Sequence, residues 1–470
     1  MITIAQQGTW LPADTQTPIS LYLALVRDKH GFLLESSEVD GRLGRYSLIG
    51  WDFRLILSCV NGNLEVQSFD PRLHDLKRYS GQGYIQGLRS CLDNVCITAP
   101  ENLGALPAVT RSICGYLAYN MGGIFEPALA DKLPPASGQS TFVLPGKIIV
   151  FDHLHHRCCY LTLDSTAQLN GCQRISPPAQ PVVGAITIQP EHEQFVRQVE
   201  RAKDYIAQGE AIQIVLSTRF SAPFSGSPFE LYRRLRQINP SPYTFFMHFE
   251  EQTLMGSSPE LLIRCEDGLL QLRPIAGTRV RGVTEAEDQQ LAHDLVHDKK
   301  ECAEHAMLVD LGRMDLARIA EPESVRVDKY MQVERFSHVM HLTSYLSAGL
   351  AKGLDALDVL RAGFPAGTVS GAPKIRAMQI IADEEKMDRG PYAGGIGWIG
   401  LDKGQVNLDM GITIRSLWVK NGTVHWQAGA GLIAESDPEK EWQECHNKAR
   451  AILKAITSTG AGDEFVHRTL

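Results

Sequence analysis

The sequence has no long apolar run and no basic tract. No stretch approaches the roughly 20 apolar residues that span a bilayer, and the opening MITIAQQGTW lacks the segments of a secretory signal. Lys and Arg total 46 against 54 Asp and Glu, a formal net charge of −8. These absences argue against a membrane or nucleic acid as the main partner. We expect a cytoplasmic protein that acts on a small molecule or binds another protein.

Cysteine motifs, repeats and low-complexity tracts are also missing. The ten cysteines are scattered without a C-x-x-C pair, which predicts reduced packing thiols rather than zinc ligands or disulfides. The composition, 44% hydrophobic and 21% charged, is that of a globular protein. At 470 residues the chain is long enough for two large domains or about three average ones.

The order of patterns predicts a mixed α/β protein with large sheets. Short apolar runs separated by turn residues fill the first part, and a Ser-, Gln- and Pro-rich connection follows at about 164–190. We place a β-rich N-terminal domain at 1–185 and a second domain at 186–470. In the second, helical patterns lie at 191–210, 285–320, 354–363, 373–385 and 438–457, and the predicted strands include 212–220, 253–265, 395–400, 408–419 and 424–435.

Three motifs invite a functional interpretation that their context weakens. Residues 395–400 match G-x-G-x-x-G, but no helix follows, so a glycine-rich strand is favoured over a dinucleotide site. The His- and Cys-rich segment 153–159 lacks metal-ligand spacing and is more typical of a hairpin. Residues 367–374 lack the spacing of a phosphate loop. Their backbone amides, preceding a helix, could still hold an anion such as a carboxylate.

Two pairs of carboxylates are more informative. Glu301 and Glu304 share one face of a predicted helix, and Glu441 and Glu444 share a face of another. Four such carboxylates could enclose a hard cation such as Mg²⁺. The spacing alone favours two solvated helix faces with ordinary Glu/Lys pairs, so both interpretations stay open at this point.

Several ordered strings resemble the chorismate-utilising enzymes and, within that family, the large subunits of anthranilate synthases. The strings are SPELLIR, RPIAGTRVRG, KECAEHAMLVDLGRMDLAR, VERFSHVMHLTS, RAGFPAGTVSGAPKIRAM, RGPYAGGIGW and QAGAGLIAESDPEKEWQECHNKARAIL. The resemblance covers about 200–456, more weakly upstream. It implies an α/β sandwich with extensive, mainly antiparallel sheets, an N-terminal regulatory region, a Mg²⁺ requirement and a glutamine amidotransferase partner that supplies ammonia.

Two positions bear on the nucleophile that attacks chorismate. Where the isochorismate-forming members carry a water-activating lysine this chain has Gln213, and where aminodeoxychorismate synthases carry a nucleophilic lysine it has Ala276. Glutamine is no general base near pH 7, and alanine offers no nucleophile. Ammonia then remains as the nucleophile that attacks chorismate. The resemblance therefore implies conversion of chorismate to anthranilate and pyruvate, the first step of tryptophan biosynthesis.

The resemblance also assigns roles to individual residues. Mg²⁺ would be held by Glu304 and Glu444, with Glu301 and Glu441 assisting directly or through water. Glu260 matches the general acid for the departing hydroxyl, and His341 matches the histidine tied to the elimination step. Tyr392 and Arg415 match the groups that hold the enolpyruvyl carboxylate. The lesser candidates are Thr278 and Gln213 beside the catalytic groups and Lys448, Gly371 and Gly431 around the bound anions.

The resemblance further implies feedback inhibition by tryptophan. The family uses a serine in LLES, here Ser36, and a segment NPSPYMFF, here Pro240, Ser241, Pro242 and Tyr243 followed by Thr244 in place of methionine. Cys302 and Met314 stand where the family commonly has arginine and asparagine. Since little sequence follows the last predicted helix, we expect a separate small subunit. The alternatives are an aminodeoxyisochorismate synthase, an aminodeoxychorismate synthase of a folate pathway, and a non-catalytic tryptophan-binding or partner-binding homologue.

Overall fold

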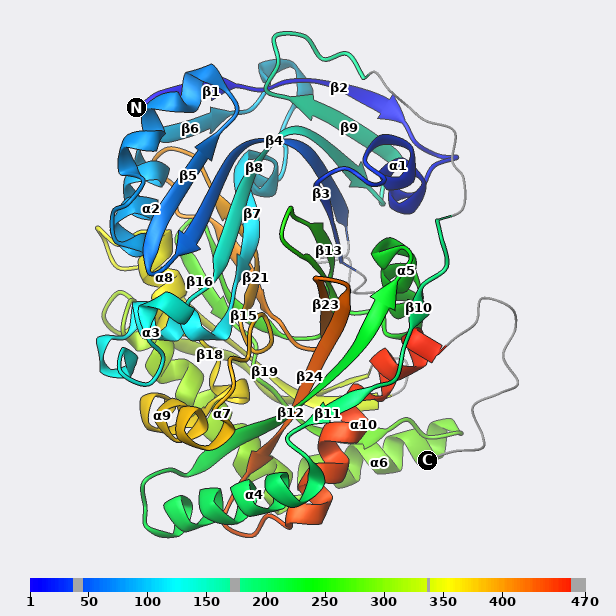
Figure 1. The fold of residues 1–470 in the computed structure, drawn as a ribbon, viewed down its shortest axis with the longest axis vertical. Helices are drawn as coiled ribbons and strands as arrows, with labels where there is room; N and C mark the ends of the chain where they lie inside the picture. The colour runs from blue at the N-terminus through cyan, green and yellow to red at the C-terminus, as the bar shows by residue number, and fades with distance from the viewer. Residues whose placement is uncertain (37–44, 170–177, 336–338, 458–470) are drawn as a thin grey trace.

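The computed structural model describes residues 1–36, 45–169, 178–335 and 339–457. Every cysteine among these residues is a free thiol. Cys172, one of the predicted packing thiols, and part of the predicted connection at 164–190 lie outside the described residues. In Figure 1 the strands of the N-terminal half occupy the upper part of the molecule, and the helices α4, α6, α7, α9 and α10 the lower part.

The N-terminal half is rich in strands, as predicted. Its strands are β1 (Ile2–Ala5), β2 (Gln7–Pro12), β3 (Gly31–Glu35), β4 (Tyr46–Val60), β5 (Asn63–Ser68), β6 (Val95–Thr98), β7 (Ser112–Leu117), β8 (Ser140–Asp152) and β9 (Arg157–Thr162). Its α-helices are α1 (Pro18–Leu25), α2 (Tyr84–Asp93) and α3 (Gly122–Phe125). The predicted hairpin at 153–159 is confirmed, because β8 pairs with β9 across it.

The C-terminal half mixes strands and helices. Its strands are β10 (Val182–Val183), β11 (Thr187–Gln189), β12 (Gln213–Ser225), β13 (Tyr243–His248), β14 (Thr253–Ser258), β15 (Leu261–Glu266), β16 (Leu269–Leu272), β17 (Ile275–Val280), β18 (Arg326–Arg335), β19 (Val339–Gly349), β20 (Gly371–Ala372), β21 (Gly395–Gly400), β22 (Leu408–Ile412), β23 (Ser416–Lys420) and β24 (Thr423–Leu432). Its α-helices are α4 (His192–Ala207), α5 (Pro228–Ile238), α6 (Glu285–His297), α7 (Lys299–Ala317), α8 (Ala356–Gly363), α9 (Lys374–Glu385) and α10 (Pro438–Thr457). The glycine-rich strand predicted at 395–400 is confirmed as β21.

Apart from the parallel pair β1 and β6, all described strands belong to one connected set of 22 strands. Their pairings are antiparallel, which confirms the predicted fold class. Three pairings cross the boundary predicted at residue 185: β3 pairs with β13, β7 pairs with β21, and the short strand β10 pairs with β12. The two halves therefore share hydrogen-bonded sheet.

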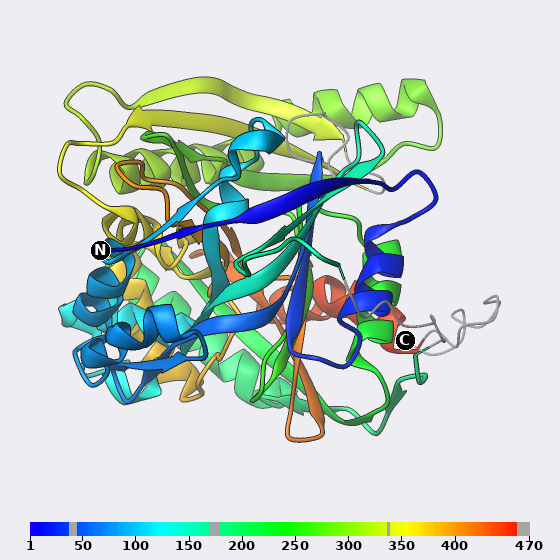
Figure 2. The ribbon, with the colours of Figure 1, turned by 90° about the horizontal axis from the view of Figure 1, so that it is seen from above.

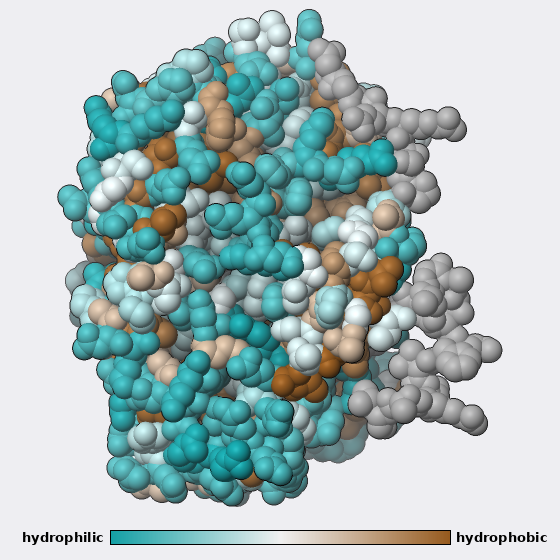
Figure 3. All heavy atoms as spheres, viewed as in Figure 1, coloured by the Kyte–Doolittle hydropathy of each residue, from teal (hydrophilic) through white to brown (hydrophobic). Residues whose placement is uncertain are grey.

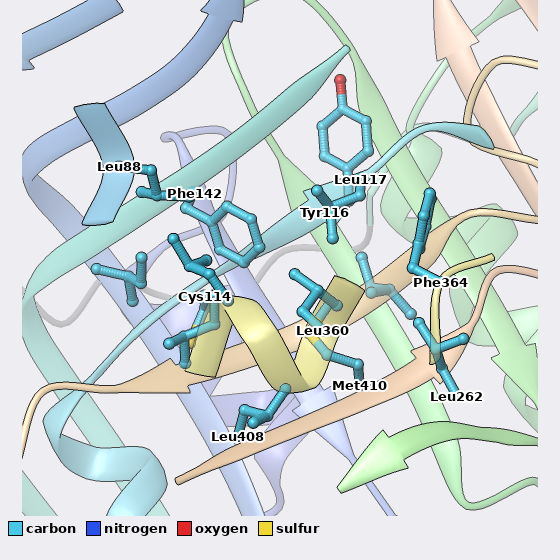
Figure 4. Close-up of a cluster of buried hydrophobic side chains, with 14 of the residues drawn as sticks. Leu88, Cys114, Tyr116, Leu117, Phe142, Leu262, Leu360, Phe364, Leu408 and Met410 are labelled. Atoms are coloured by element: carbon cyan, nitrogen blue, oxygen red, sulfur yellow. The ribbon is translucent and has the colours of Figure 1, made fainter. Parts of the chain in front are cut away.

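The largest hydrophobic core also draws on both halves. Figure 4 shows part of it, with Leu88 and Phe142 from the N-terminal half beside Leu262, Leu360 and Leu408 from the C-terminal half. Each of these side chains is at most 2% exposed. Burial of this kind is worth roughly 1.5–3 kcal/mol for each large side chain, so much of the stabilisation of either half comes from contact with the other.

Two strands predicted as continuous are interrupted. The strand predicted at 253–265 divides into β14 and β15 at Pro259, whose nitrogen has no hydrogen to donate to a ladder. The strand predicted at 408–419 divides into β22 and β23, and Arg415 between them has a left-handed φ of 49°. The helical pattern at 285–320 divides where the Asp298 side chain accepts from Lys300 N and Glu301 N and so caps α7.

The hairpin of β18 and β19 flanks the helices α6 and α7. Figure 2 shows these two strands in yellow along one side, beside the helices in light green. The inner face of α6 contributes Ala292 and Leu295 to a small core with Met340 and Leu342 of β19. This packing fixes the position of α7 relative to β17 and β19.

The surface shows no broad apolar field on the face drawn in Figure 3, where apolar side chains lie in small separate groups among hydrophilic ones. Among the described residues, no helix combines the length and the apolar character needed to cross a bilayer.

Candidate active site

The two predicted pairs of carboxylates meet in the structure. Glu301 and Glu304 lie on α7, and Glu441 and Glu444 lie on α10. Burial raises the pKa of Glu304, and the negative charges of Glu301 and Glu444 raise it further. Burial also raises the pKa of Glu441, to which Glu444 adds. The effect of Glu444 on Glu304 brings α10 near α7 at this point, although the two helices are more than 100 residues apart in the chain.

Basic side chains offset part of this negative charge. Arg279 Nη1 donates to Glu301 Oε1 over 3.1 Å, and the same guanidinium pairs with Asp298 at 2.6 Å. Lys448 Nζ lies 2.6 Å from Glu444 Oε1. Arg279 was not singled out by the sequence analysis, although its place directly after Thr278 in the PIAGTR string is the signal that would have found it.

The carboxylates suit a hard divalent cation in their chemistry. Within the described ranges, no three of the His, Cys, Asp and Glu side chains stand close enough together to form a metal-binding group. Mg²⁺ does not need such a group, because it keeps several waters and takes only one or two carboxylates directly. Burial is the main cause of the raised pKa values of Glu304 and Glu441, and neighbouring carboxylates add to it, so a cation bound among them would favour their ionised form. The donor set therefore fits Mg²⁺.

Glu260 occupies the break between β14 and β15 and is 9% exposed. Burial raises the pKa of its carboxyl to about 7, against the opposing effects of the nearby Thr368 hydroxyl and the charges of Lys448 and Arg415. A carboxyl with this pKa is protonated in a large fraction of molecules near neutrality. It can therefore donate a proton, as the general acid predicted at this position must. A small cavity of about 50 Å³, also lined by Thr368 and Asp315, borders it.

Arg415 and Tyr392 lie together beside Glu260. The charge of Arg415 acts on both Tyr392 and Glu260, and that of Glu444 acts in turn on Arg415. Tyr392 is 3% exposed, and a side chain at Gly429 would come within 2.7 Å of its hydroxyl. Lys448 Nζ donates to the Gly429 carbonyl over 2.9 Å. A guanidinium, an ammonium and a phenol thus lie near one another, as an anionic ligand requires.

A buried arginine that the sequence analysis missed supports Tyr392. Arg389 is 1% exposed and lies three residues before Tyr392, with its guanidinium 5.7 Å from the tyrosine ring centre. It pairs with Glu385, donates to Val369 O over 2.8 Å and donates to Val215 O over 2.7 Å. It therefore ties Tyr392 to strand β12 and to the segment before Gly371. In the sequence, the signal that would have identified Arg389 is its place as the first residue of the RGPYAG string.

His341 lies on β19 opposite Thr278 of β17. Its Nδ1 is 3.0 Å from the Gly277 carbonyl, which can only accept, so Nδ1 carries the hydrogen. Burial lowers the pKa of His341, which favours the neutral ring. Neutral imidazole with hydrogen on Nδ1 has its basic lone pair on Nε2. Thr278 Oγ1 lies 3.1 Å from the same Nδ1, so its role is to orient the ring.

Gln213, Gly371 and Gly431 also meet. Gln213 begins β12, where it pairs with Ala372 next to Gly371. Its side chain is 4% exposed, and a Cβ on Gly431 would lie 2.6 Å from its Nε2. Gln213 Oε1 is buried, and no hydrogen-bond donor reaches it from the described residues. An unpaired buried acceptor of this kind indicates a place for a hydrogen-bonding ligand or water.

A separate, larger cavity lies where the predicted tryptophan segments meet. It has a volume of about 300 Å³, and Ser36, Pro242, Tyr243 and Thr244 line it together with Trp398. Ser36 Oγ is buried with no hydrogen-bond partner from the described ranges. The other two predicted residues, Pro240 and Ser241, are not among the lining residues and precede them on the same loop.

Thr244 differs from the methionine of the resembled family, and its hydroxyl is satisfied locally. Its Oγ1 donates to Ser241 O over 3.0 Å and lies 3.0 Å from Ser257 Oγ. The Thr244 hydroxyl therefore adds no unpaired polar group to the cavity. Tyr243 donates to Asp409 Oδ1 over 2.7 Å at another part of the wall.

Comparison with known proteins gives a consistent result. The sequence profile described as chorismate binding enzyme matches residues 69–454. Anthranilate synthase component 1 of Aquifex aeolicus is 40% identical over 95% of this chain and 94% of its own length, and that of Streptomyces coelicolor is 41% identical over 94% and 87%.

Solved structures of related proteins resemble this chain as well. Anthranilate synthase component I of Streptococcus pneumoniae superposes with a TM-score of 0.70 at 32% identity, over 94% of this chain and 98% of its own. The menaquinone-specific isochorismate synthase of Escherichia coli has a TM-score of 0.71 at 21% identity, over 97% and 95%. The latter likeness concerns the fold alone.

Proposed function

The chain belongs to the family of chorismate-binding enzymes, and from that premise we propose that it is the chorismate-converting component of an anthranilate synthase. The observation that carries the proposal is that Glu260, Arg415, Tyr392 and Lys448 lie within electrostatic reach of one another and of carboxylates on α7 and α10. An acid, a set of cations and a hard-cation site are what chorismate, with two carboxylates and a leaving hydroxyl, needs.

Substrate binding follows from the charges of the site. Arg415 offers two parallel donors to the enolpyruvyl carboxylate, and the Tyr392 hydroxyl adds a directional bond. Mg²⁺, held by Glu304 and Glu444 with Glu301 and Glu441 assisting, would supply positive charge for the ring carboxylate when it is bound. Without a cation, that carboxylate would face four like charges.

The nucleophile is assigned from what this chain lacks. Neither Gln213 nor Ala276 can activate water or attack covalently, so ammonia forms the new bond at C2 of chorismate. Gln213 Oε1, a buried acceptor with no donor among the described residues, is suited to receive an N–H of ammonia. The ring double bonds shift as the C4–O bond breaks, and Glu260 protonates the departing hydroxyl to water.

Elimination completes the reaction. His341 Nε2 takes the proton from C2, and the bond between C3 and the enolpyruvyl oxygen breaks. The leaving group is the enolate of pyruvate, which takes up one proton at its CH2 carbon, from water, to become pyruvate. Since Nδ1 is fixed to the Gly277 carbonyl, the ring presents Nε2 as its base. Aromatisation of the ring to anthranilate drives this step.

We also propose the partner and the inhibitor that the family implies. The relatives are named component 1, which supports a separate glutamine amidotransferase subunit as the source of ammonia. The cavity of about 300 Å³ beside Ser36 and Tyr243 is large enough for an amino acid with an indole ring, and we propose it as the feedback site for tryptophan. The division into a regulatory region 1–185 and a catalytic region 186–470 belongs to the same proposal.

A single assay tests the proposal. Purified chain is mixed with chorismate, Mg²⁺ and an ammonium salt near pH 8.5, and anthranilate is followed by its fluorescence while pyruvate is measured by mass. We expect equal amounts of both products and no reaction after chelation of Mg²⁺. The Glu260→Gln variant is the matched control, because it removes the acid while keeping the shape of the side chain.

The other functions give different results in the same assay. A product that keeps the enolpyruvyl group would indicate an aminodeoxyisochorismate or aminodeoxychorismate synthase, according to the position of the amino group. Unchanged chorismate together with tight tryptophan binding would indicate a non-catalytic homologue. Either result would contradict the proposed function.

A further inference from the structure

A row of polar residues crosses the sheet between the larger cavity and the active site. Thr244 on β13 pairs with Glu35 on β3 and with Ser257 on β14. Ser257 N donates to Arg415 O over 3.1 Å, so the row continues to the residue between β22 and β23. Directly paired residues of an antiparallel sheet project from the same face. Glu35, Thr244 and Ser257 therefore form one line across the sheet, and the backbone bond from Ser257 continues it to Arg415, which lies outside the strands.

Hydrogen bonds join neighbours along this row. The hydroxyls of Thr244 and Ser257 lie 3.0 Å apart. Ser257 Oγ donates to Asn239 O, and Asn239 Nδ2 donates to Ser257 O over 3.0 Å. Both Ser257 and Thr244 are at most 2% exposed, so water does not compete for these bonds.

Helix α5 holds both ends of this arrangement. At the cavity end, Tyr232 and Arg236 of α5 donate to the Glu35 carboxylate, which is 7% exposed. At the other end, Asn239 caps the C-terminus of α5 and donates a hydrogen bond from its side chain to the Ser257 carbonyl. Glu35 is therefore connected to Ser257 by two routes, through the sheet by way of Thr244 and through helix α5.

Arg415 depends on its surroundings for its conformation. Its φ of 49° lies in the left-handed region, which is unfavourable for a residue with a side chain. Such a conformation persists only where neighbours impose it. The bond from Ser257 N to the Arg415 carbonyl is one of these restraints, and it comes from the strand that also leads to Glu260.

We propose that Ser257 is a positioning residue that couples the larger cavity to the grip of Arg415 on the substrate. The inference rests on the proposed function, in which tryptophan occupies that cavity and Arg415 holds the enolpyruvyl carboxylate. Tryptophan against Thr244 displaces Ser257, and the displaced strand releases the Arg415 carbonyl. Because Arg415 binds substrate, the coupling appears as a raised KM for chorismate more than as a lowered kcat.

Ser257→Ala tests the coupling, because it removes the hydroxyl and keeps the backbone N–H. Tryptophan binding is measured by calorimetry on the full chain, and the KM for chorismate is measured with ammonia as the nucleophile, with and without saturating tryptophan. In the unaltered protein we expect tryptophan to raise the KM at least tenfold. In Ser257→Ala we expect tryptophan to bind within threefold of its normal affinity and to raise the KM less than threefold.

Three further variants guard against a trivial explanation. Thr253→Val removes another buried hydroxyl from the same strand, away from the cavity lining, and should keep the full tryptophan effect on KM. Should Ser257→Ala fail to fold, Thr244→Val and Thr244→Ser replace it. Valine removes the hydroxyl and should weaken the coupling, whereas serine retains it and should restore the coupling.

The outcomes separate this inference from the function on which it rests. Full coupling in Ser257→Ala with normal tryptophan affinity would overturn the role of Ser257 and leave the feedback site in place. The same loss of coupling in Thr253→Val would also overturn it. Failure of the unaltered protein to bind tryptophan would overturn the proposed feedback site itself, and the coupling with it.

Discussion

The pKa of Glu260 links catalysis to pH. Its carboxyl has a pKa of about 7 in the folded protein, against about 4.5 for an ordinary glutamate. The acid form declines above pH 7, so we expect kcat/KM for chorismate, at a constant concentration of free ammonia, to fall about tenfold per pH unit above that value. Glu260→Gln should lower kcat by a factor of about 10²–10⁴. A flat profile between pH 7 and 9 would contradict the assignment of the acid.

The same group makes a prediction about stability. Because the folded pKa is raised, burial of Glu260 carries no penalty below about pH 4.5, and the penalty grows until pH 7. A difference of this size corresponds to about 3 kcal/mol at pH 8. We expect Glu260→Gln to raise the free energy of unfolding at pH 8 by about that amount and to have little effect at pH 4.5. Urea titrations at the two pH values measure the difference.

The acidic cluster makes a prediction that does not depend on activity. Mg²⁺ bound to the folded state should raise the melting temperature of the unaltered protein. Glu304→Gln and Glu444→Gln should each abolish that increase and Mg²⁺-dependent turnover, with an unchanged circular dichroism spectrum. Asp310→Asn on α7 and Glu439→Gln on α10 are matched controls, since both carboxylates are exposed. A normal response to Mg²⁺ in Glu304→Gln or Glu444→Gln would remove that residue from the metal site.

At the scale of elements, the irregularity in strand β17 at Gly277 joins Glu301 to His341. Gly277 has a φ of +69°, a side chain there would lie 3.1 Å from Glu301 Oε2, and its carbonyl holds His341 Nδ1. Gly277→Ala should therefore lower the free energy of unfolding by about 1–2 kcal/mol and lower kcat at least tenfold. Gly268→Ala is the control, because that φ is +81° but the space around it is open. Equal activities in the two variants would contradict this role.

The periodicity of the sequence predicted which segments are helices and which are strands. It did not predict where a strand is interrupted. The amphipathic helix at 191–210 and the strand at 212–220 were readily predicted, and the structure has α4 and β12 there. The strands predicted at 253–265 and 408–419 are each broken, and Glu260 and Arg415 stand at the breaks. Apolar alternation carries no information about a bend that tertiary contacts impose, such as the bond from Ser257 N to Arg415 O. Such bends are where functional residues leave the ladder of the sheet.

The candidate site was foreseen through resemblance more than through spacing. Spacing alone placed Glu301 with Glu304 and Glu441 with Glu444, but the approach of α7 to α10 depends on long-range packing that no local pattern encodes. Arg389 escaped notice for the same reason: in sequence it is one arginine among many, and only its burial and its bonds to Val369 and Val215 reveal its function.

At the scale of the whole molecule, the two halves share both sheet and core. The pairings of β3 with β13 and of β7 with β21 cross the predicted boundary, and the main core contains Phe142 beside Leu262 and Leu408. Separating the halves would expose these strand edges and this apolar surface to water together. The free energy that holds each half folded is therefore largely a shared quantity.

This shared stabilisation predicts one cooperative unfolding transition, even though we propose separate functions for the two regions. We expect a single calorimetric peak whose enthalpy equals the van't Hoff enthalpy. Tryptophan fluorescence, which samples Trp51 in one half and Trp426 in the other, should follow the same urea midpoint as circular dichroism. Two separated transitions would show that each half folds without the other. Because pocket and active site are joined by the same paired strands, such independence would also remove the mechanical basis for coupling between them.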